Sequence, residues 1–531
     1  MSTITALGPT STRNKPAILL SLLMAALLIN LETTMVNVAL PILVKELHAT
    51  TNQLQWIVDA YNLVFAALLL TMGSLSDRFG RKAMLLGGLA VFGLSSMAGG
   101  LVTDPAALIA ARAVMGLGAA MTFPATLSII SNVFTGRTER AEAIGAWGAT
   151  AGAAIALGPI AGGFLLEHFS WSSIFFAMGP VAAVAFGLVA VTVPPSRALE
   201  AKRIDVGGLI LSAAFMATLV YTIIEAPTYG WSASRSVAGF LASTVLLVAF
   251  IAWERRQEEP MLDVQIFKNL RFSAASGSVT VAFFTLFGFI FLIIQYMQFV
   301  RAWSPLSAGV HTLPVAVAVG VGSVIGTPLA VKVGTKLIVG LGLLAITAFY
   351  LWVGLSLTST TSYWIIASQM VLYGIGMGFT SAPATDSIMG AVSLGKAGVG
   401  SAVNDSTRLL GGTLGVAVIG SVYASIYGSH LGSHLPAGLP TAAGAAAKQS
   451  VGAAQVVAQR ATSLGHPVLG AAVREASTNA FMSGLTTACL VAGAVAALGC
   501  IAAAAFLPAQ PPTAMFDEAG AVEGPLAFAA P

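Results

Sequence analysis

Two ionisable side chains lie deep inside long apolar runs, where a charged group could bind and release a proton. Glu32 falls in the run 17–41 and Arg112 in the run 105–132. An isolated carboxylate in an apolar medium is costly, and protonation removes that cost, so Glu32 suits proton binding and release. Arg112 would then bias the proton affinity of a nearby acid. The alternative is a permanent ion pair between Glu32 and Arg112.

Three further charged residues in apolar runs are candidates for the site. Asp59, about two turns into the run 51–72, could draw a cation into an outer vestibule. Tyr61, on the same run, is typical of the aromatic belt at a membrane surface. Asp405 and Arg408 are three residues apart and share one face of a helix, so they can pair. We favour that structural pair over a role in transport.

Enzymatic chemistry has no support in the sequence. No Ser-His-Asp, HExxH or CxxC arrangement is present, and the two cysteines both fall in the last apolar run. The loop Gly390–Ala397 nearly spells a phosphate-binding loop, but its last position is alanine where serine or threonine would hold magnesium. We therefore expect no enzyme activity, no cofactor and no metal.

Composition identifies an integral membrane protein. Of 531 residues, 56% are hydrophobic and 9% are charged, whereas a soluble domain carries about 25% charged residues. Runs near 20 residues predict fourteen membrane helices. These runs are 17–41, 51–72, 84–103, 105–132, 141–166, 172–195, 205–227, 236–252, 272–299, 306–331, 336–356, 363–391, 398–426 and 475–508.

The distribution of basic residues predicts the orientation. With the N-terminus inside, 17 of the 25 lysines and arginines fall in inner segments and 6 in outer segments. This bias agrees with the positive-inside rule and places both termini in the cytoplasm. The basic residues are scattered through short loops rather than gathered in a patch, so no nucleic-acid partner is expected.

Three motifs resemble those of one transporter family. The loop 73–82 is similar to the signature loop of the major facilitator superfamily, and segment 152–163 to the motif that marks its antiporters. Segment 31–41 resembles the first-helix motif of the fourteen-helix drug:proton antiporter branch, the EmrB/QacA group, which commonly has aspartate where this chain has Glu32. The matching residues of the first two motifs are Gly73, Asp77, Arg78, Gly80, Arg81 and Lys82, and Gly158, Pro159, Gly162 and Gly163.

The resemblance implies an all-α major facilitator fold with two six-helix halves plus two inserted helices. Segment 327–336 looks like a degenerate copy of the loop 73–82, which fits two related halves. The expected divisions are an N-terminal half (1–195), a two-helix insertion (196–260), a C-terminal half (261–508) with an outer loop (427–474), and a cytoplasmic tail (509–531).

The function that the resemblance implies is proton-coupled export of amphipathic compounds, cationic ones favoured, across the plasma or inner membrane. Arg112, Asp59, Asp405 and Arg408 would accompany Glu32 in coupling or substrate binding, and the loop 73–82 would switch conformation. The alternative is export of a specific metabolite, siderophore or lipid by the same fold. The expected partners are the small-molecule substrate, protons and the lipid bilayer, with no obligate protein partner.

Overall fold

The computed structural model describes residues 14–196, 205–391 and 397–509. The tail predicted from residue 509 onward lies outside these residues except for its first position. So do most of the loop that nearly spells a phosphate-binding motif and five basic residues of the orientation count. Those five are Arg13, Arg197, Lys202, Arg203 and Lys396.

Fourteen helices of the described chain are long and apolar enough to cross a membrane, which confirms the predicted number. No strand occurs in the described ranges. The helices are α1 (Lys15–Glu46), α2 (Thr51–Phe79), α3 (Arg81–Gly99), α4 (Pro105–Val133), α5 (Arg137–His168), α6 (Ser173–Thr192), α7 (Val206–Tyr229), α8 (Ser234–Glu254), α9 (Leu270–Gln295), α10 (Pro305–His311), α11 (Leu313–Val333), α12 (Thr335–Ser356), α13 (Tyr363–Gly390), α14 (Ala397–His434), α15 (Thr441–Gln449), α16 (Val451–Ser463) and α17 (Pro467–Phe506). One span consists of α9 with the π-helical turn η3 (Tyr296–Val300), and another of α10 with α11.

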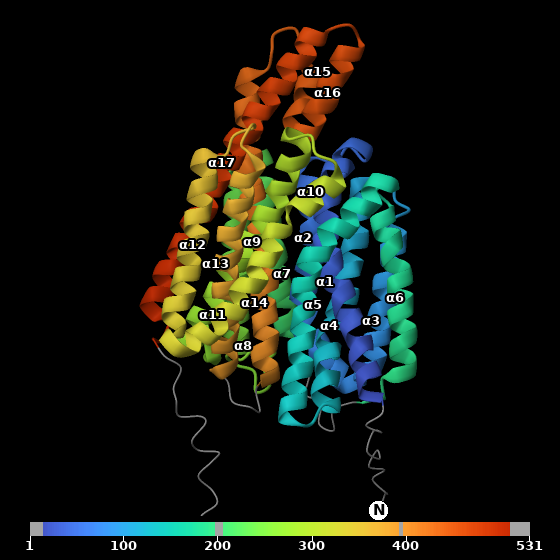
Figure 1. Ribbon diagram of the computed structural model, residues 1–531, viewed down its shortest axis with the longest axis vertical. Helices are drawn as coiled ribbons and strands as arrows, with labels where there is room; N and C mark the ends of the chain where they lie inside the picture. Colours follow the sequence, from blue (N-terminus) through green and yellow to red (C-terminus); the bar gives the residue numbers. More distant parts are fainter. Residues whose placement is uncertain (1–13, 197–204, 392–396, 510–531) are drawn as a thin grey trace, which may run out of the picture.

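The spans form one upright bundle with a small helical hairpin above it (Figure 1). Helices α1 to α6 pack mainly on one another, as do α9 and α11 to α14 with α17, and the pair α7–α8 touches both groups through α2 and α14. We call the end that carries α15 and α16 the hairpin face. The opposite end, where α1 begins and α17 ends, is the terminal face (Figure 1).

Glycine allows the helices to approach closely. A methyl group on Gly118 of α4 would lie 2.6 Å from the backbone nitrogen of Phe92 on α3, and one on Gly378 of α13 would lie 2.5 Å from that of Ser323 on α11. Association between membrane helices depends on such contacts, because lipid is as apolar as the side chains it would replace.

Two loops at corresponding positions share one backbone conformation. Gly80 joins α2 to α3 with φ 108° and ψ 126°, and Gly334 joins α11 to α12 with φ 103° and ψ 138°. Residues other than glycine are disfavoured at such positive φ angles. Each loop also meets the end of the last helix of its group, through Ser196 beyond α6 and Ala509 beyond α17. The resemblance between segments 73–82 and 327–336 therefore extends to backbone geometry.

The segment expected as an outer loop at 427–474 is shorter than predicted. Helix α14 continues to His434 and α17 begins at Pro467, so 435–466 joins them. The apolar pattern ends near the membrane surface, but the helices continue beyond it. The hairpin α15–α16 contacts both helix groups: Thr51 of α2 donates to the Gln449 carbonyl (2.8 Å), and Gln455 donates to the Phe299 carbonyl (2.6 Å).

Candidate functional site

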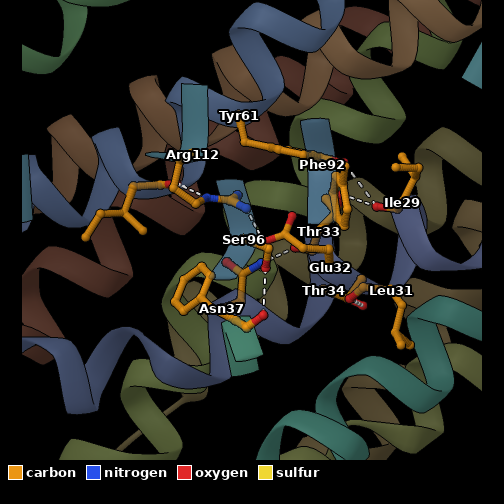
Figure 2. A network of polar contacts seen from close by, with 12 residues as sticks. Ile29, Leu31, Glu32, Thr33, Thr34, Asn37, Tyr61, Phe92, Ser96 and Arg112 are labelled. Atoms are coloured by element: carbon orange, nitrogen blue, oxygen red, sulfur yellow. Dashed lines mark hydrogen bonds and ion pairs between the residues drawn. The ribbon is translucent and has the colours of Figure 1, made fainter. Parts of the chain in front are cut away.

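The centre of the site is an ion pair between α1 and α4. Glu32 and Arg112 are both completely buried, and Arg112 Nη1 donates to Glu32 Oε1. Figure 2 shows the two side chains pointing toward each other from their separate helices. The sequence left open whether Glu32 pairs with Arg112; in this structure it does.

Helix α2 holds the guanidinium of Arg112 in place. Arg112 Nε donates to the Ile57 carbonyl (2.7 Å), and its guanidinium carbon lies 4.5 Å from the ring centre of Tyr61. Tyr61 is itself completely buried, and its hydroxyl donates to the Ile29 carbonyl (3.2 Å). The interpretation of Tyr61 as a belt aromatic is therefore wrong, because its ring faces a buried cation instead of the membrane surface.

The ion pair leaves two polar atoms without partners. Glu32 Oε2 and Arg112 Nη2 are buried and make no hydrogen bond to any described residue. Each has lost its hydration without full compensation, and such an unsatisfied atom costs about 1–3 kcal/mol. The pair is therefore less stable than a fully satisfied one.

Asp59 lies in a different environment on the same helix. It is completely buried, and neither carboxylate oxygen has a partner among the described residues. Gln55, one turn nearer the hairpin face, donates to the Val416 and Ala417 carbonyls and to Ser421 Oγ on α14. Asp59 thus lies close to the side of α2 that packs on α14, and it does not face an open vestibule in this state.

Sequence reasoning did not single out Gln55 or Ser421. Ser421 Oγ also donates to the Ile223 carbonyl of α7 (2.8 Å), so these two side chains link α2, α14 and α7. A glutamine four residues before a membrane aspartate was the available signal, since that spacing places both on neighbouring positions of one helix face.

The expected pair between Asp405 and Arg408 is not a direct ion pair in this structure, although the two charges still interact. Both residues are described, and none of the three ion pairs of the described chain joins them. Arg408 instead donates to Thr385 Oγ1 on α13 (3.0 Å), with its guanidinium carbon 5.3 Å from the Phe283 ring centre. Sequence spacing puts the two residues on one helix face, and the contacts with α13 and α9 hold the Arg408 guanidinium out of direct contact with the Asp405 carboxylate.

The loop 73–82 attaches α2 and α3 to the end of α6. Asp77 Oδ1 accepts from Arg81 Nε at 2.8 Å, the Arg81 backbone N–H donates to the Ser196 carbonyl at 2.8 Å, and Lys82 Nζ donates to the Ala190 carbonyl at 2.8 Å. Gly73 lies near Pro124 of α4, and Arg78 lies 6.0 Å from the ring centre of Phe79. These contacts stay within the first group of helices.

The motif at 158–163 packs α5 against two helices. A side chain on Gly158 would overlap Thr34 of α1, and one on Gly162 would lie 3.2 Å from the Met35 carbonyl. A methyl group on Gly163 would lie 2.6 Å from Leu306 Cα on α10.

The contact between α5 and α10 is equally close when it is examined from α10. A side chain on Gly309 of α10 would overlap the Pro159 carbonyl of α5. Backbone therefore meets backbone between the two helix groups, and this contact closes the bundle at the hairpin face.

The same face of α5 is open near the terminal face. Gly145, Gly148 and Gly152 share the helical face of Pro159 and Gly163, because the steps between them are three, four, seven and four residues. A methyl group on any of the three glycines would meet nothing within 4 Å. The two groups therefore touch at the hairpin face and diverge toward the terminal face.

In the described ranges, no group of three or more His, Cys, Asp or Glu side chains lies close enough together to hold a metal ion.

Comparison with known protein families and curated proteins gives clear matches. The family model described as Major Facilitator Superfamily matches residues 22–416. The multidrug efflux pump LfrA of Mycolicibacterium smegmatis is 34% identical over 80% of this chain and 84% of its own length. The methyl viologen resistance protein SmvA of Salmonella typhimurium is 33% identical over 73% of this chain and 79% of its own length.

Solved structures agree on the fold. A bacterial homolog of the human lysosomal transporter Spinster, in an inward-facing and occupied conformation, matches with a TM-score of 0.65 at 17% identity. The match covers 92% of this chain and 97% of that one. At this identity the likeness supports the fold alone.

We predict that Glu32→Gln destabilises the protein, because it leaves the Arg112 charge buried without a partner. Breaking a buried pair in this way lowers the free energy of unfolding by about 3–5 kcal/mol. The double variant Glu32→Gln/Arg112→Gln should lose less than the sum of the two single variants. Thermal unfolding of purified protein in detergent measures this coupling.

The matched control is Glu139→Gln, whose carboxylate pairs with Lys15 at 2.8 Å but is 42% exposed. An exposed pair contributes about 0–1 kcal/mol, so this variant should unfold nearly as the wild type does. Additive effects of the Glu32 and Arg112 substitutions would contradict the coupling.

We also predict that Gly309→Leu prevents closure of the hairpin face, because its side chain would overlap the Pro159 carbonyl. A cysteine introduced at the fully buried Ala308, in a chain with Cys489→Ser and Cys500→Ser, reports closure. Labelling by a membrane-impermeant maleimide from the hairpin side should rise several-fold. Gly187→Leu on α6, where a side chain meets open space, should leave labelling unchanged. Equal labelling in both variants would refute the role of this contact.

Proposed function

Because this chain belongs to the Major Facilitator Superfamily, we propose that it is a proton-coupled exporter of amphipathic organic compounds. The observation that carries the proposal is the completely buried Glu32–Arg112 pair, held between α1 and α4 with one carboxylate oxygen unsatisfied. The protein is a multi-pass membrane transporter and not an enzyme. The expected export function agrees with relatives named for multidrug efflux and methyl viologen resistance.

Substrates of this exporter are lipophilic cations. Methyl viologen, named in one relative, is a dication. An apolar cavity supplies affinity for a lipophilic body, and a few well-placed acids supply selection by charge. Glu32, Asp59 and Asp405 are buried acids available for that selection. The alternative substrate is a specific metabolite, siderophore or lipid, which would leave the fold and the coupling unchanged.

Proton coupling follows from competition at Glu32. Its carboxylate can hold Arg112, a proton or a substrate cation, and each of these neutralises the same charge. In this structure Glu32 is paired with Arg112 while the bundle is open toward the terminal face, which corresponds to the state after proton release. Protonation from the other side separates the pair, and the difference in affinity between the two conformations drives the exchange.

Alternating access moves the two six-helix groups against each other. We place their boundaries at 1–195 and 261–508, with α7 and α8 as an insertion between them. With both termini in the cytoplasm, the terminal face is cytoplasmic and the closed hairpin face is external. The contact between α5 and α10 stabilises this inward-open state. In the same state, the Asp77–Arg81 pair keeps the loop 73–82 attached to α6. The membrane is the plasma or inner membrane of the cell.

The test is transport by purified protein in proteoliposomes. An imposed pH gradient should drive uptake of a cationic dye with wild-type protein, and ATP without a gradient should drive none. Glu32→Gln should lower the gradient-driven rate at least tenfold, whereas Glu32→Asp should keep much of it because it retains the carboxylate. The control Glu258→Gln changes an exposed acid between α8 and α9 and should transport normally. Transport by ATP alone, or full transport by Glu32→Gln, would refute the proposal.

A further inference from the structure

A groove lies beside the end of α8 at the terminal face. Its volume is about 440 Å³, and it is formed by the last turns of α8 and by the segment that follows. Phe250, Ile251 and Phe267 supply apolar wall, and Arg255 and Lys268 supply positive charge. The described lining contains no acidic residue. None of these residues takes part in the proposed coupling.

An apolar ridge along α8 leads to this groove. Leu241 is 63% exposed, Val245 67% and Val248 61%. The steps of four and three residues put these side chains on one face of the helix, and a further step of seven reaches Arg255. Only 17% of the most apolar stretch of α8 is buried inside the protein. The ridge therefore faces the hydrocarbon of the membrane and ends at a positive charge.

The two basic residues form no ion pair with any residue that the structure describes. Arg255 and Lys268 are both exposed. A cation beside apolar surface is stabilised when it keeps water or meets an anion. Two such cations at the mouth of one groove form a site complementary to a negatively charged group.

Trp253 marks the depth of the groove relative to the membrane. Its side chain is 40% exposed, and its indole N–H donates to Asp205 Oδ1 at 2.8 Å. Asp205 in turn caps α7 by accepting from the Gly208 backbone N–H (2.8 Å). Tryptophan with its polar edge satisfied and its ring partly exposed is typical of the headgroup level. The groove thus lies where phospholipid phosphates lie.

We propose that this groove binds an anionic phospholipid from the leaflet at the terminal face. Its phosphate lies between Arg255 and Lys268, and one acyl chain follows the ridge of Leu241, Val245 and Val248. Two features identify an anionic phospholipid as the occupant: the positive charge of Arg255 and Lys268, and the ridge that faces hydrocarbon. On the orientation proposed above this is the cytoplasmic leaflet, but the site does not depend on which compound the protein transports.

A bound lipid would also steady the connection between the insertion and the second helix group. The backbone N–H of Leu262, in the segment after α8, donates to Glu254 Oε2 at 3.2 Å, and the segment continues into α9. Arg255 lies at the end of α8, and Lys268 directly precedes Asn269, the N-cap of α9. A phosphate that contacts both basic residues therefore joins the end of α8 to the start of α9. The lipid would act as a clamp between the two elements.

Native mass spectrometry of the full-length protein tests the proposal. Protein is delipidated in detergent and mixed with phosphatidylglycerol or phosphatidylcholine of identical acyl chains. Each basic residue near the surface contributes about 1 kcal/mol toward an anionic lipid. The variant Arg255→Gln/Lys268→Gln should therefore bind phosphatidylglycerol about 30-fold more weakly, with phosphatidylcholine binding unchanged. Arg256→Gln removes a neighbouring exposed charge that does not line the groove and should bind as the wild type does.

Three results would overturn the proposal. Wild-type protein could bind both lipids equally, or the double variant could bind phosphatidylglycerol as tightly as Arg256→Gln does. Displacement of phosphatidylglycerol by millimolar inorganic phosphate would show a site for free anions in place of lipid. A monodisperse elution profile for every variant establishes that loss of lipid is not loss of fold.

Discussion

The packing of the helices in this molecule depends on one buried ion pair. Glu32 and Arg112 have no access to water, and removing two ions from water costs several kcal/mol per ion unless they meet each other with good geometry. Helices α1, α2 and α4 must therefore stay packed around the pair, with the Ile57 carbonyl and the Tyr61 ring on the guanidinium. Any event that changes the charge of Glu32 changes the balance that holds these helices together.

In the proposed mechanism, close backbone contact converts that local balance into a movement of helix groups. Helix α5 touches α1 through Gly158 and Gly162 and touches α10 through Gly163. A shift of α1 would thus be transmitted to the contact that closes the hairpin face. Packed interfaces are bistable and do not deform continuously, so a small displacement at a buried charge can select between two arrangements. At Gly158 and Gly163 a larger side chain would overlap the neighbouring helix, so glycine permits the close approach.

Much of this architecture was readable from the sequence, and the failures share a cause. Apolar run length predicts the fourteen spans, and basic residues at equal offsets around Gly80 and Gly334 predict two related loops, because both signals are local. The partners of Tyr61 and Arg408 were not predictable, since a helical position does not specify which neighbouring helix faces it. The limits of segment 427–474 were also wrong by several residues. Hydropathy reports where the membrane ends, whereas capping and packing decide where a helix ends.

Proton release on substrate binding tests the central claim most directly. Purified protein in weakly buffered detergent solution is mixed with tetraphenylphosphonium over a range of pH while a pH-sensitive dye reports free protons. If Glu32 exchanges a proton for the cation, wild-type protein releases a proton on cation binding at a pH low enough to protonate Glu32, and Glu32→Gln releases none. Equal proton release by the two proteins would show that another group carries the proton and that the Glu32–Arg112 pair only holds the helices together.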